Sequence, residues 1–522
     1  MMPGTGRDHG LDHVVVLMFE NRSFDHLLGY LYRPGEVPAF EGVVGRELSN
    51  PIPSDVPGAG RNVVPVHPAA NMNTPDPDPG EEHPHTNTQL YGTVAPPENR
   101  LAKGDAMKSP FNAPDDPSQP PTMSGFVTDY VNAFRVEMER WPNYDEYAQI
   151  MACYTPEQLP VLSALAKGFA CFDHWFCEVP TQTYANRSFF HAASSSGYVL
   201  NAPPGKFSFR NDAPTIFERL EAAKLPWKVY IDPEQILSAT GLIHARRLSP
   251  YFATRFSTIF DFYDDARRGT LPAYSFLEPN MFHPHTDMHP PGGGRIRREL
   301  HVPAAGSILG GERLLARVYD SIRASSTPDG SNWRNTLLLV TFDEHGGTYD
   351  HVPPPAVPPP DPSVPEGEEG FRFDRSGVRI PTVAISAWID PGTVVTEEYR
   401  STSVIRTLRE HWNLGAPLTH RDAVAADLSL VLRRETPRPA EDWPRVVPPP
   451  SGILERIAAE FDRLPLERLE RDLVGEARAL EARATGEGPP TDIETMSHRE
   501  ADHHSRRIGT TMFPRVVGGR RS

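Results

Sequence analysis

The sequence predicts an α/β fold, a three-layer α/β/α sandwich around a mainly parallel sheet. Short apolar runs such as TLLLVTF at residues 336–342 are typical of strands covered on both faces. Amphipathic helical segments alternate with these runs, as in strand–helix–strand units. The strands also end in polar residues, and open α/β sheets bind their ligands at the carboxyl ends of the strands.

Individual strands and helices can be predicted from the apolar patterns along the chain. HVVVLM at residues 13–18 predicts a buried strand, and residues 23–32 predict the helix after it. Residues 160–169 predict a helix because their apolar side chains recur on one face. By the same criteria we predict further strands at 227–231, 336–342 and 382–386, and further helices at 217–225, 311–324 and 403–412.

Two regions depart from this alternation. Residues 33–122 are rich in proline and show little periodicity, so we expect a long insertion over the site. Residues 437–450 form a proline-rich connector to a C-terminal extension, 437–522. There the apolar spacing predicts two amphipathic helices broken near Pro465, followed by a basic tail that we expect to be a solvated or loosely packed arm. The main domain is expected to span residues 1–436.

Composition limits the classes of function. The chain has 522 residues and a net charge of −16, which argues against a nucleic-acid partner because phosphate backbones are bound by clustered Lys and Arg. No apolar run approaches the ~20 residues that a membrane span requires, and no secretory signal is visible. We therefore expect a cytoplasmic protein, monomeric or a small homo-oligomer, with secretion by another route left open. The three cysteines are expected to be reduced core thiols.

Two predicted strands end in potential metal ligands. Glu20 and Asn21 follow the first strand, and Asp343 and Glu344 follow the strand at 336–342. If both strands are central and parallel, these groups meet at one edge, where the carboxylates repel one another unless a cation is bound. Oxygen ligands of this kind suit a divalent ion of the Ca²⁺, Mg²⁺ or Mn²⁺ class. The alternative is that Asn21 or Ser23 only caps the next helix.

A third stretch, PTQTYANR at residues 180–187, offers a nucleophile. Thr183 precedes a helix expected to start near residues 185–188, whose N–H groups and positive dipole end favour an anion. Arg187 adds a planar fork suited to phosphate oxygens. A cation at the Thr183 oxygen would favour the alkoxide needed for attack. The alternative is an ordinary threonine cap beside a surface arginine.

Together these motifs resemble the bacterial phosphoesterase family, which includes phospholipases C and an acid phosphatase and belongs to the alkaline phosphatase superfamily. The resemblance covers roughly residues 12–415. It is carried by segments that stand in the family's order: HVVVLMFENRSFDHLLGYL, PTQTYANR, HPP at 289–291, GGERLLARVYDSI, TLLLVTFDEHGGTYDHVPPP and GVRIPTVAISAWIDPGTV.

The resemblance implies roles for individual residues. It implies that Thr183 is the nucleophile and that one divalent metal is held by Glu20, Asn21, Asp343 and Glu344. Asn186 and Arg187 would shape the phosphate pocket, and His351 is assigned to substrate binding or to orienting the metal ligands. The histidines that contact the phosphoryl group are matched to His85 and His289, with His83, His283 and His285 as rivals.

The function implied is a metal-dependent hydrolase of phosphoric esters, a phospholipase C-like phosphodiesterase that forms a phosphothreonine. Its partner would be a phosphate ester, with phospholipid as one candidate. The alternative is an acid phosphatase on the same site. A sulfatase and a non-enzymatic binding protein are the less favoured readings, because the sulfatase spacing is absent and all five predicted metal and nucleophile groups are intact.

Overall fold

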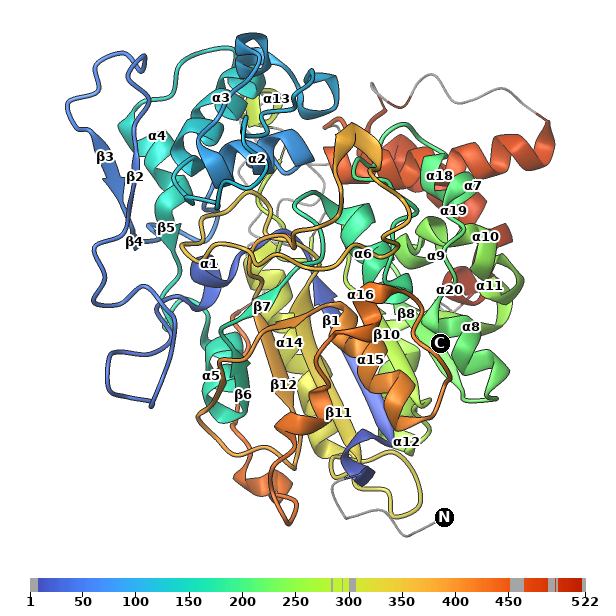
Figure 1. Ribbon diagram of the computed structural model, residues 1–522. Coiled ribbons are helices and arrows are strands. Elements are labelled where there is room, and N and C mark those ends of the chain that lie inside the picture. The colour runs from blue at the N-terminus through green and yellow to red at the C-terminus, as the bar shows by residue number, and fades with distance from the viewer. Residues whose placement is uncertain are drawn as a thin grey trace.

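The structure is a computed structural model that describes residues 8–282, 285–292, 294–299, 307–450, 464–486, 493 and 496–518. Its centre is an eight-stranded sheet, and the helices surround it (Figure 1). The strands lie in the order β13 (Thr393–Val395), β6 (Ala170–Phe172), β12 (Thr382–Ile385), β11 (Thr336–Phe342), β1 (His13–Phe19), β10 (Tyr274–Glu278), β8 (Trp227–Ile231) and β9 (Phe256–Thr258).

The sheet is mainly parallel, as predicted. β12 alone runs against its neighbours β11 and β6, and the other pairings in the sheet are parallel. The predicted strand at 382–386 therefore exists with the opposite direction. The chain between β11 and β12, residues 343–381, is a long loop with one short 3-10 turn, Glu368–Gly370, and lacks the crossover helix that usually connects parallel neighbours.

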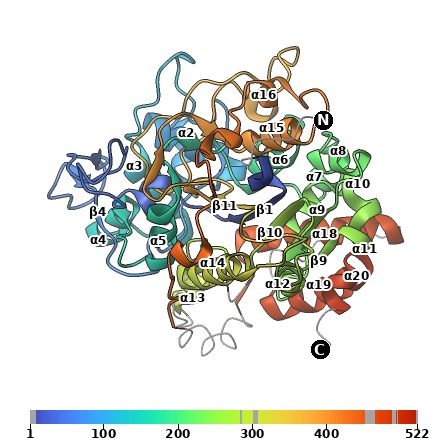
Figure 2. The same ribbon diagram turned by 90° about the horizontal axis from the view of Figure 1, so that it is seen from below.

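Helices cover both faces of the sheet, which confirms the three-layer sandwich. Figure 2 shows α14 (Ser307–Ala324) and α12 (Ile259–Arg268) on one face and α6 (Thr183–Ala192) and α15 (Thr402–His411) on the other. The first group also includes α5 (Pro160–Gly168), which packs on α14, β6 and β12. The predicted helix at 217–225 is α8 (Ile216–Ala222), and the one at 23–32 is the shorter α1 (Phe24–Leu28), capped by Ser23.

The smaller elements complete the chain. The short helices are α4 (Tyr144–Ala148), α7 (Lys206–Arg210), α9 (Ala239–Ile243), α10 (Ala245–Leu248), α11 (Phe252–Arg255), α13 (Gly294–Glu299) and α16 (His420–Ala423). The strands outside the main sheet are β2 (Ser49–Pro51), β3 (Val63–Pro65), β4 (His67–Pro68), β5 (Ala152–Cys153), β7 (Trp175–Phe176) and β14 (Tyr399–Arg400).

The proline-rich insertion is more ordered than its sequence indicates. It contains α2 (His83–Tyr91), which packs against α3 (Phe126–Met138). Leu90 of α2 and Phe126 of α3 belong to a small hydrophobic core separate from the one around the sheet. In Figure 1 this lobe lies at the upper left, beside the carboxyl ends of the strands.

The C-terminal extension packs on the main body. Its helices are α18 (Arg468–Thr485), α19 (His498–Met512) and α20 (Pro514–Gly518), drawn red in Figure 1. Phe513 is fully buried against Phe252 and Phe256, with ring centroids 4.7 and 5.3 Å away. The predicted loosely packed arm is therefore wrong, because α19 and α20 carry apolar residues that join the main core. The predicted helix before Pro465 lies mostly outside the described residues.

Two composition-based expectations can be compared with the structure. Cys153, Cys171 and Cys177 are buried free thiols, as expected. Within the described ranges, no helix combines the length and the apolar composition needed to cross a membrane.

Candidate active site

The two predicted strand ends meet at one edge of the sheet. β1 and β11 pair in parallel with Phe19 opposite Phe342, so Glu20 and Asp343 follow side by side. The predicted ligands Glu20, Asn21, Asp343 and Glu344 are all buried. The backbone N–H groups of Asn21 and Glu344 donate to Asp343 Oδ1 at 3.2 and 2.7 Å. This carboxylate therefore holds both strand ends in register.

The Gly-Gly turn after β11 is built for close approach. Gly346 and Gly347 have φ of +59° and +64°, the left-handed region that favours glycine. A Cβ on Gly346 would overlap the backbone oxygen of Asn21, and one on Gly347 would overlap the carbonyl of Gly80. The predicted tight turn is thus required by the strand end that carries Asn21.

Thr183 faces this edge from the start of α6. The helix begins at Thr183 itself, slightly earlier than predicted, and its N-cap is Gln182, whose side chain makes no capping hydrogen bond. The Thr183 hydroxyl donates to Glu20 Oε2 at 3.4 Å. The alternative in which Thr183 serves only as a helix cap is therefore not supported, because its hydroxyl is directed to the strand end.

Arg187 lies one turn further along α6 and is fully buried. Its guanidinium forms an ion pair with Glu20 Oε1 and another with Asp343 Oδ2, the latter at 3.4 Å from Nε. Burial disfavours the charged form, but these carboxylates outweigh it and raise the pKa of Arg187. Nη1 has no hydrogen-bond partner within the described part of the chain. This leaves one donor available to a phosphate oxygen.

The chemistry of the strand ends fits a cation. Asn21 Oδ1 and Glu344 Oε1 are buried and have no hydrogen-bond partner among the described residues. Burial is the main cause that raises the pKa values of Glu20 and Glu344, and nearby carboxylates raise them further. A divalent ion would satisfy the unpartnered oxygens and relieve this repulsion. Arg187 forms an ion pair with both Glu20 and Asp343, so its guanidinium lies between these two carboxylates.

The side-chain amide of Asn186 is hydrogen-bonded to the loop that precedes Thr183. Its Oδ1 accepts from the backbone N–H of Glu178 and Val179 at 3.0 and 2.9 Å, and its Nδ2 donates to the carbonyls of Val179, Thr181 and Gln182 at 3.1, 2.8 and 3.3 Å. The amide is therefore committed to the loop that leads to Thr183. These contacts favour positioning of the nucleophile over contact with phosphate.

Of the candidate histidines, His289 reaches the strand ends. Its Nε2 lies 2.9 Å from Asn21 Nδ2, and its Nδ1 lies 2.7 Å from the carbonyl oxygen of Pro290. Because a carbonyl only accepts, these bonds place the hydrogen on Nδ1 and the lone pair on Nε2. In this tautomer Nε2 is an acceptor, so it can bind a cation or accept a proton.

The other histidine candidates lie in separate contacts. His85 Nδ1 pairs with Asp129 Oδ1 at 2.7 Å, and its Nε2 faces Glu82 Oε2 at 3.9 Å. His83 Nδ1 lies 2.9 Å from the carbonyl oxygen of Pro180, on the loop before Thr183. His285 pairs with Asp287 at 3.0 Å, and His283 lies outside the described residues. His85 and His285 thus each have an imidazole that is oriented by a carboxylate, Asp129 and Asp287 respectively.

His351 belongs to a neighbouring buried network. Its Nδ1 lies 2.6 Å from Asp25 Oδ2, and Arg379 donates to Asp25 and to Asp350, each at 2.9 Å. The network ties α1 to the loop after β11, and so braces both strand ends. The contacts therefore favour the orienting role for His351 over contact with substrate.

Two acidic residues of the site were missed by the sequence analysis. Glu81 Oε2 accepts a hydrogen bond from Asn21 Nδ2, and Asp78 Oδ1 lies 3.9 Å from His289 Nδ1. Burial, followed by repulsion from Asp78, raises the pKa of Glu81 to about 8. Both acids stand in the segment DPDPGEEHPH at 76–85, just before the predicted histidines, so their closeness to these histidines is the signal that could have found them.

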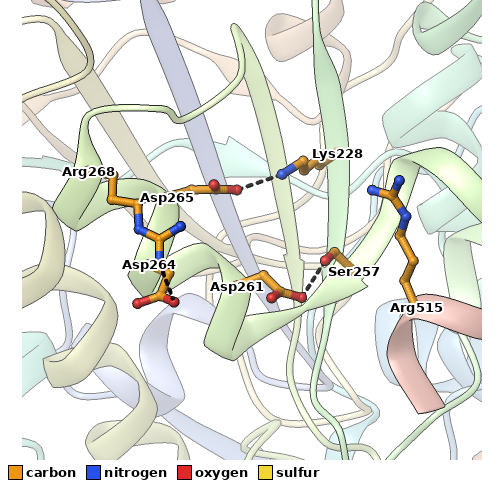
Figure 3. Close-up of a pocket in the computed structure, with 7 residues that line it drawn as sticks. All are labelled: Lys228, Ser257, Asp261, Asp264, Asp265, Arg268 and Arg515. Carbon is orange, nitrogen blue, oxygen red and sulfur yellow. Dashed lines mark hydrogen bonds and ion pairs between the residues drawn. The ribbon is translucent and has the colours of Figure 1, made fainter. Parts of the chain in front are cut away.

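Two surface hollows differ in their relation to this edge. One of about 390 Å³ lies between β8, α12 and α20, and two of its charged pairs are Lys228 with Asp265 at 2.6 Å and Arg268 with Asp264 at 3.6 Å (Figure 3). The other, of about 330 Å³, is lined by the insertion and by residues 366–375, with His83 in its wall. Because His83 contacts Pro180, this second hollow adjoins the loop of Thr183.

Comparison with known proteins gives a consistent result. The model of the Phosphoesterase family matches residues 11–415. The chain is 32% identical over 452 residues to non-specific phospholipase C6 of Arabidopsis thaliana, covering 83% of this chain and 74% of the relative. It is 26% identical over 499 residues to phospholipase C A of Mycobacterium tuberculosis, covering 87% and 83%. A solved protein in the alkaline phosphatase superfamily from Vibrio parahaemolyticus aligns at 14% identity with a TM-score of 0.29, over 54% of this chain and 65% of that chain.

Proposed function

The chain belongs to the Phosphoesterase family and hydrolyses phosphoric esters, and from this premise we propose that it is a phospholipase C-like phosphodiesterase that works through a phosphothreonine. The observation that carries the proposal is the Thr183 hydroxyl, which points from the start of α6 to Glu20 at the metal-binding edge. A hydroxyl, an arginine and acidic side chains therefore stand together at this edge of the sheet.

In the first step the Thr183 oxygen attacks phosphorus and the bond from phosphorus to the alcohol oxygen breaks. Glu20 accepts the hydrogen bond of the hydroxyl and is placed to take its proton. In the second step water attacks the phosphothreonine, which still carries the other ester group of the diester, so that a phosphate monoester is released and the hydroxyl of Thr183 is restored. Each step displaces one oxygen at phosphorus, as in other double displacements.

Charge on the phosphoryl oxygens is stabilised by Arg187 and by a divalent cation. The residues that would hold the cation are Glu20, Asn21, Asp343 and Glu344, and when bound it would add positive charge to the transition state. Arg187 now pairs with Glu20 and Asp343, so a bound cation would compete for these carboxylates and leave more of the guanidinium for the substrate. Positioning and charge stabilisation supply most of the acceleration in phosphoryl transfer.

We assign His85 as the group that protonates the leaving alcohol. Burial disfavours its charged ring, but the carboxylate of Asp129 outweighs this and raises the pKa of His85. The raised pKa favours the protonated ring, the form that an acid requires, and Nε2 points away from Asp129, with Glu82 Oε2 at 3.9 Å. Water in the second step would return a proton to His85.

The hollow beside His83 supports a diester substrate. Pro110, Ala113 and Phe371 give it an apolar side, and Glu369 and Arg375 give it a charged side. A second substituent on the phosphate, such as the glycerol portion of a phospholipid, would find room there. A phosphatase confined to monoesters has no use for this space, so the alternative function is less well supported.

Hydrolysis of p-nitrophenyl phosphate, bis(p-nitrophenyl) phosphate and a glycerophospholipid, with and without chelator, tests the function. We expect turnover of both diesters, loss of activity with chelator and restoration by a divalent ion. Asp343→Asn should bind the ion far less tightly. Hydrolysis of monoesters alone would move the assignment to an acid phosphatase, and full activity in metal-free protein would contradict the metal site.

A further inference from the structure

A second group of potential metal ligands adjoins the strand ends. One ligand atom each from Asp78, Glu81 and His289 lie within 4.8 Å of one another. Asp78 and Glu81 come from the insertion, and His289 comes from the loop that follows β10. Glu20, Asp343 and Glu344 do not form such a closed group among the described residues. The insertion therefore brings its own ligands to the edge of the sheet.

The hydrogen bonds of His289 prepare it for a metal. Its Nδ1 hydrogen is used by the carbonyl of Pro290 at 2.7 Å, which leaves the lone pair of Nε2 directed at Asn21 Nδ2 at 2.9 Å. The same Nδ2 donates to Glu81, so Glu81 and Nε2 lie on either side of one amide nitrogen. Histidines that bind metals commonly donate their other ring N–H to a carbonyl or carboxylate, which fixes the tautomer in this way. The ring is thus oriented as a ligand would be.

Unpartnered atoms provide an independent indication. Asp78 Oδ1 and the fully buried Asn21 Oδ1 have no hydrogen-bond partner in the described ranges. The Asn21 amide contacts both Glu81 and His289 through Nδ2, which leaves its Oδ1 for the cation expected at Glu20 and Asp343. Asp78 Oδ1 is therefore the unpartnered atom of this second group.

In a second cluster of potential ligands, an arginine already neutralises the carboxylates. Asp25, Asp350 and His351 meet the same 4.8 Å criterion, but Arg379 donates to both carboxylates at 2.9 Å. In the group of Asp78, Glu81 and His289, no Lys or Arg nitrogen of the described chain lies within 4.0 Å of either carboxylate. The nearby Arg468 of α18 instead pairs with Glu82 at 2.6 Å.

We propose that Asp78, Glu81 and His289 bind a second divalent cation next to the one expected at Glu20, Asn21, Asp343 and Glu344. A ligand set that mixes imidazole with carboxylates suits a first-row ion such as Mn²⁺ or Zn²⁺ better than Ca²⁺. The proposal deepens the proposed function, on which it rests for the first cation alone. It also gives His289 a role that agrees with its hydrogen bonds.

The number of ions bound is the test. Chelator-treated full-length protein is titrated with MnCl₂ by calorimetry, in parallel with Glu81→Gln, Asp343→Asn and the control His503→Gln, an exposed histidine on α19. We expect two Mn²⁺ per wild-type chain and per His503→Gln chain. Glu81→Gln and Asp343→Asn should each keep one, and thermal melts verify that each variant is folded, with Asp78→Asn as a second variant of the new site.

The environment of the remaining ion identifies it. Electron spin-echo spectroscopy of bound Mn²⁺ detects imidazole nitrogen, which should be present in Asp343→Asn and absent in Glu81→Gln. Equal stoichiometry and affinity in wild type and Glu81→Gln would overturn the second site, as would a single ion lost in both variants. One ion lost only in Asp343→Asn would overturn the second site and leave the proposed function standing. One ion lost only in Glu81→Gln would support the new site and contradict the first.

Discussion

The side chain of Thr183 separates the two explanations that its sequence context allows. A capping threonine accepts a hydrogen bond from the start of its own helix, whereas this hydroxyl donates to Glu20 on another element. Arg187 is buried against the same carboxylate, so it is not the surface arginine that the helix-cap alternative assumed. At the scale of single residues, the contacts therefore support catalysis over helix capping.

Thr183→Ala is expected to lower turnover by several powers of ten while the protein stays folded and still binds metal. Loss of a cap would instead cost about 1 kcal/mol of stability and leave catalysis largely intact. Thr183→Ser should retain measurable activity, because the hydroxyl survives. Steady-state kinetics and thermal melts of the three proteins decide between the explanations, and an active Thr183→Ala would remove the nucleophile from the mechanism.

His85→Gln is expected to affect substrates according to their leaving groups. p-Nitrophenolate leaves without a proton, whereas an alkoxide does not, so hydrolysis of an alkyl ester should fall about 10²–10⁴-fold and that of a p-nitrophenyl ester much less. Rates on the matched pair of substrates provide the measurement. An equal loss on both would mean that His85 positions the insertion and does not supply the proton.

The position of a site residue could be predicted where its motif lies at the end of a strand or at the start of a helix. Glu20, Asp343, Thr183 and Arg187 stand at one edge as expected, because strand ends and a helix start have defined places in an α/β fold. The contacts of Asn186 were not readable, since they depend on the path of the preceding loop. Glu81 was missed for the same reason: no periodic pattern shows where a loop residue points.

At the scale of elements, the close packing of two loops holds the strand ends in place. The turn after β11 touches the backbone of Asn21 so closely that only glycine fits at 346. Among the predicted elements, those with strong periodicity were found close to their expected bounds. β10 was missed because YSFLE is short and carries Ser275 and Glu278, and the direction of β12 could not be read from its apolar letters.

Gly346→Ala is expected to destabilise the fold and weaken metal binding together. A left-handed φ costs a non-glycine residue about 1–2 kcal/mol, and overlap with the Asn21 backbone adds to this. Gly392→Ala is the matched control, because Gly392 has φ of +70° but no atom within 4 Å of the added Cβ. Thermal melts and Mn²⁺ titrations of both variants would show the contribution of the overlap, and equal behaviour would contradict it.

At the scale of the whole molecule, the C-terminal helices belong to the same body as the site. α18 sends Arg468 to Glu82 of the insertion, and Glu467 lies 3.6 Å from His285. The apolar spacing of residues 466–480 predicted the helix, but its docking could not be predicted, because charged and apolar faces do not name their partners. The extension thus contributes charge to the rim of the site.

His285→Gln is expected to destabilise the protein in a pH-dependent way. Burial opposes its charge, but Asp287 and then Glu467 and Glu470 raise the pKa of His285 to about 10, above the ~6.5 of an unfolded chain. A raised folded-state pKa stabilises fully below about pH 6.5, and this stabilisation is lost as the pH rises toward 10. Melting temperatures should therefore differ from wild type at pH 6 and converge near pH 10.

The exposed His503→Gln on α19 is the control for that comparison. It should leave the melting temperature unchanged at both pH values, because His503 is exposed on the helix surface. A difference between wild type and His285→Gln that is the same at pH 6 and pH 10 would show that packing, and not the charge of the ring, holds the C-terminal helices at this point.

We propose that the phosphoryl group is transferred first to Thr183 and then to water. Each displacement inverts the configuration at phosphorus, so two successive displacements restore it. The most direct measurement is the stereochemical course of hydrolysis of a phosphodiester made chiral with sulfur and oxygen isotopes, analysed by phosphorus NMR of the product. We expect net retention in the wild-type enzyme. Net inversion would show that water attacks phosphorus directly, and it would contradict a phosphothreonine intermediate.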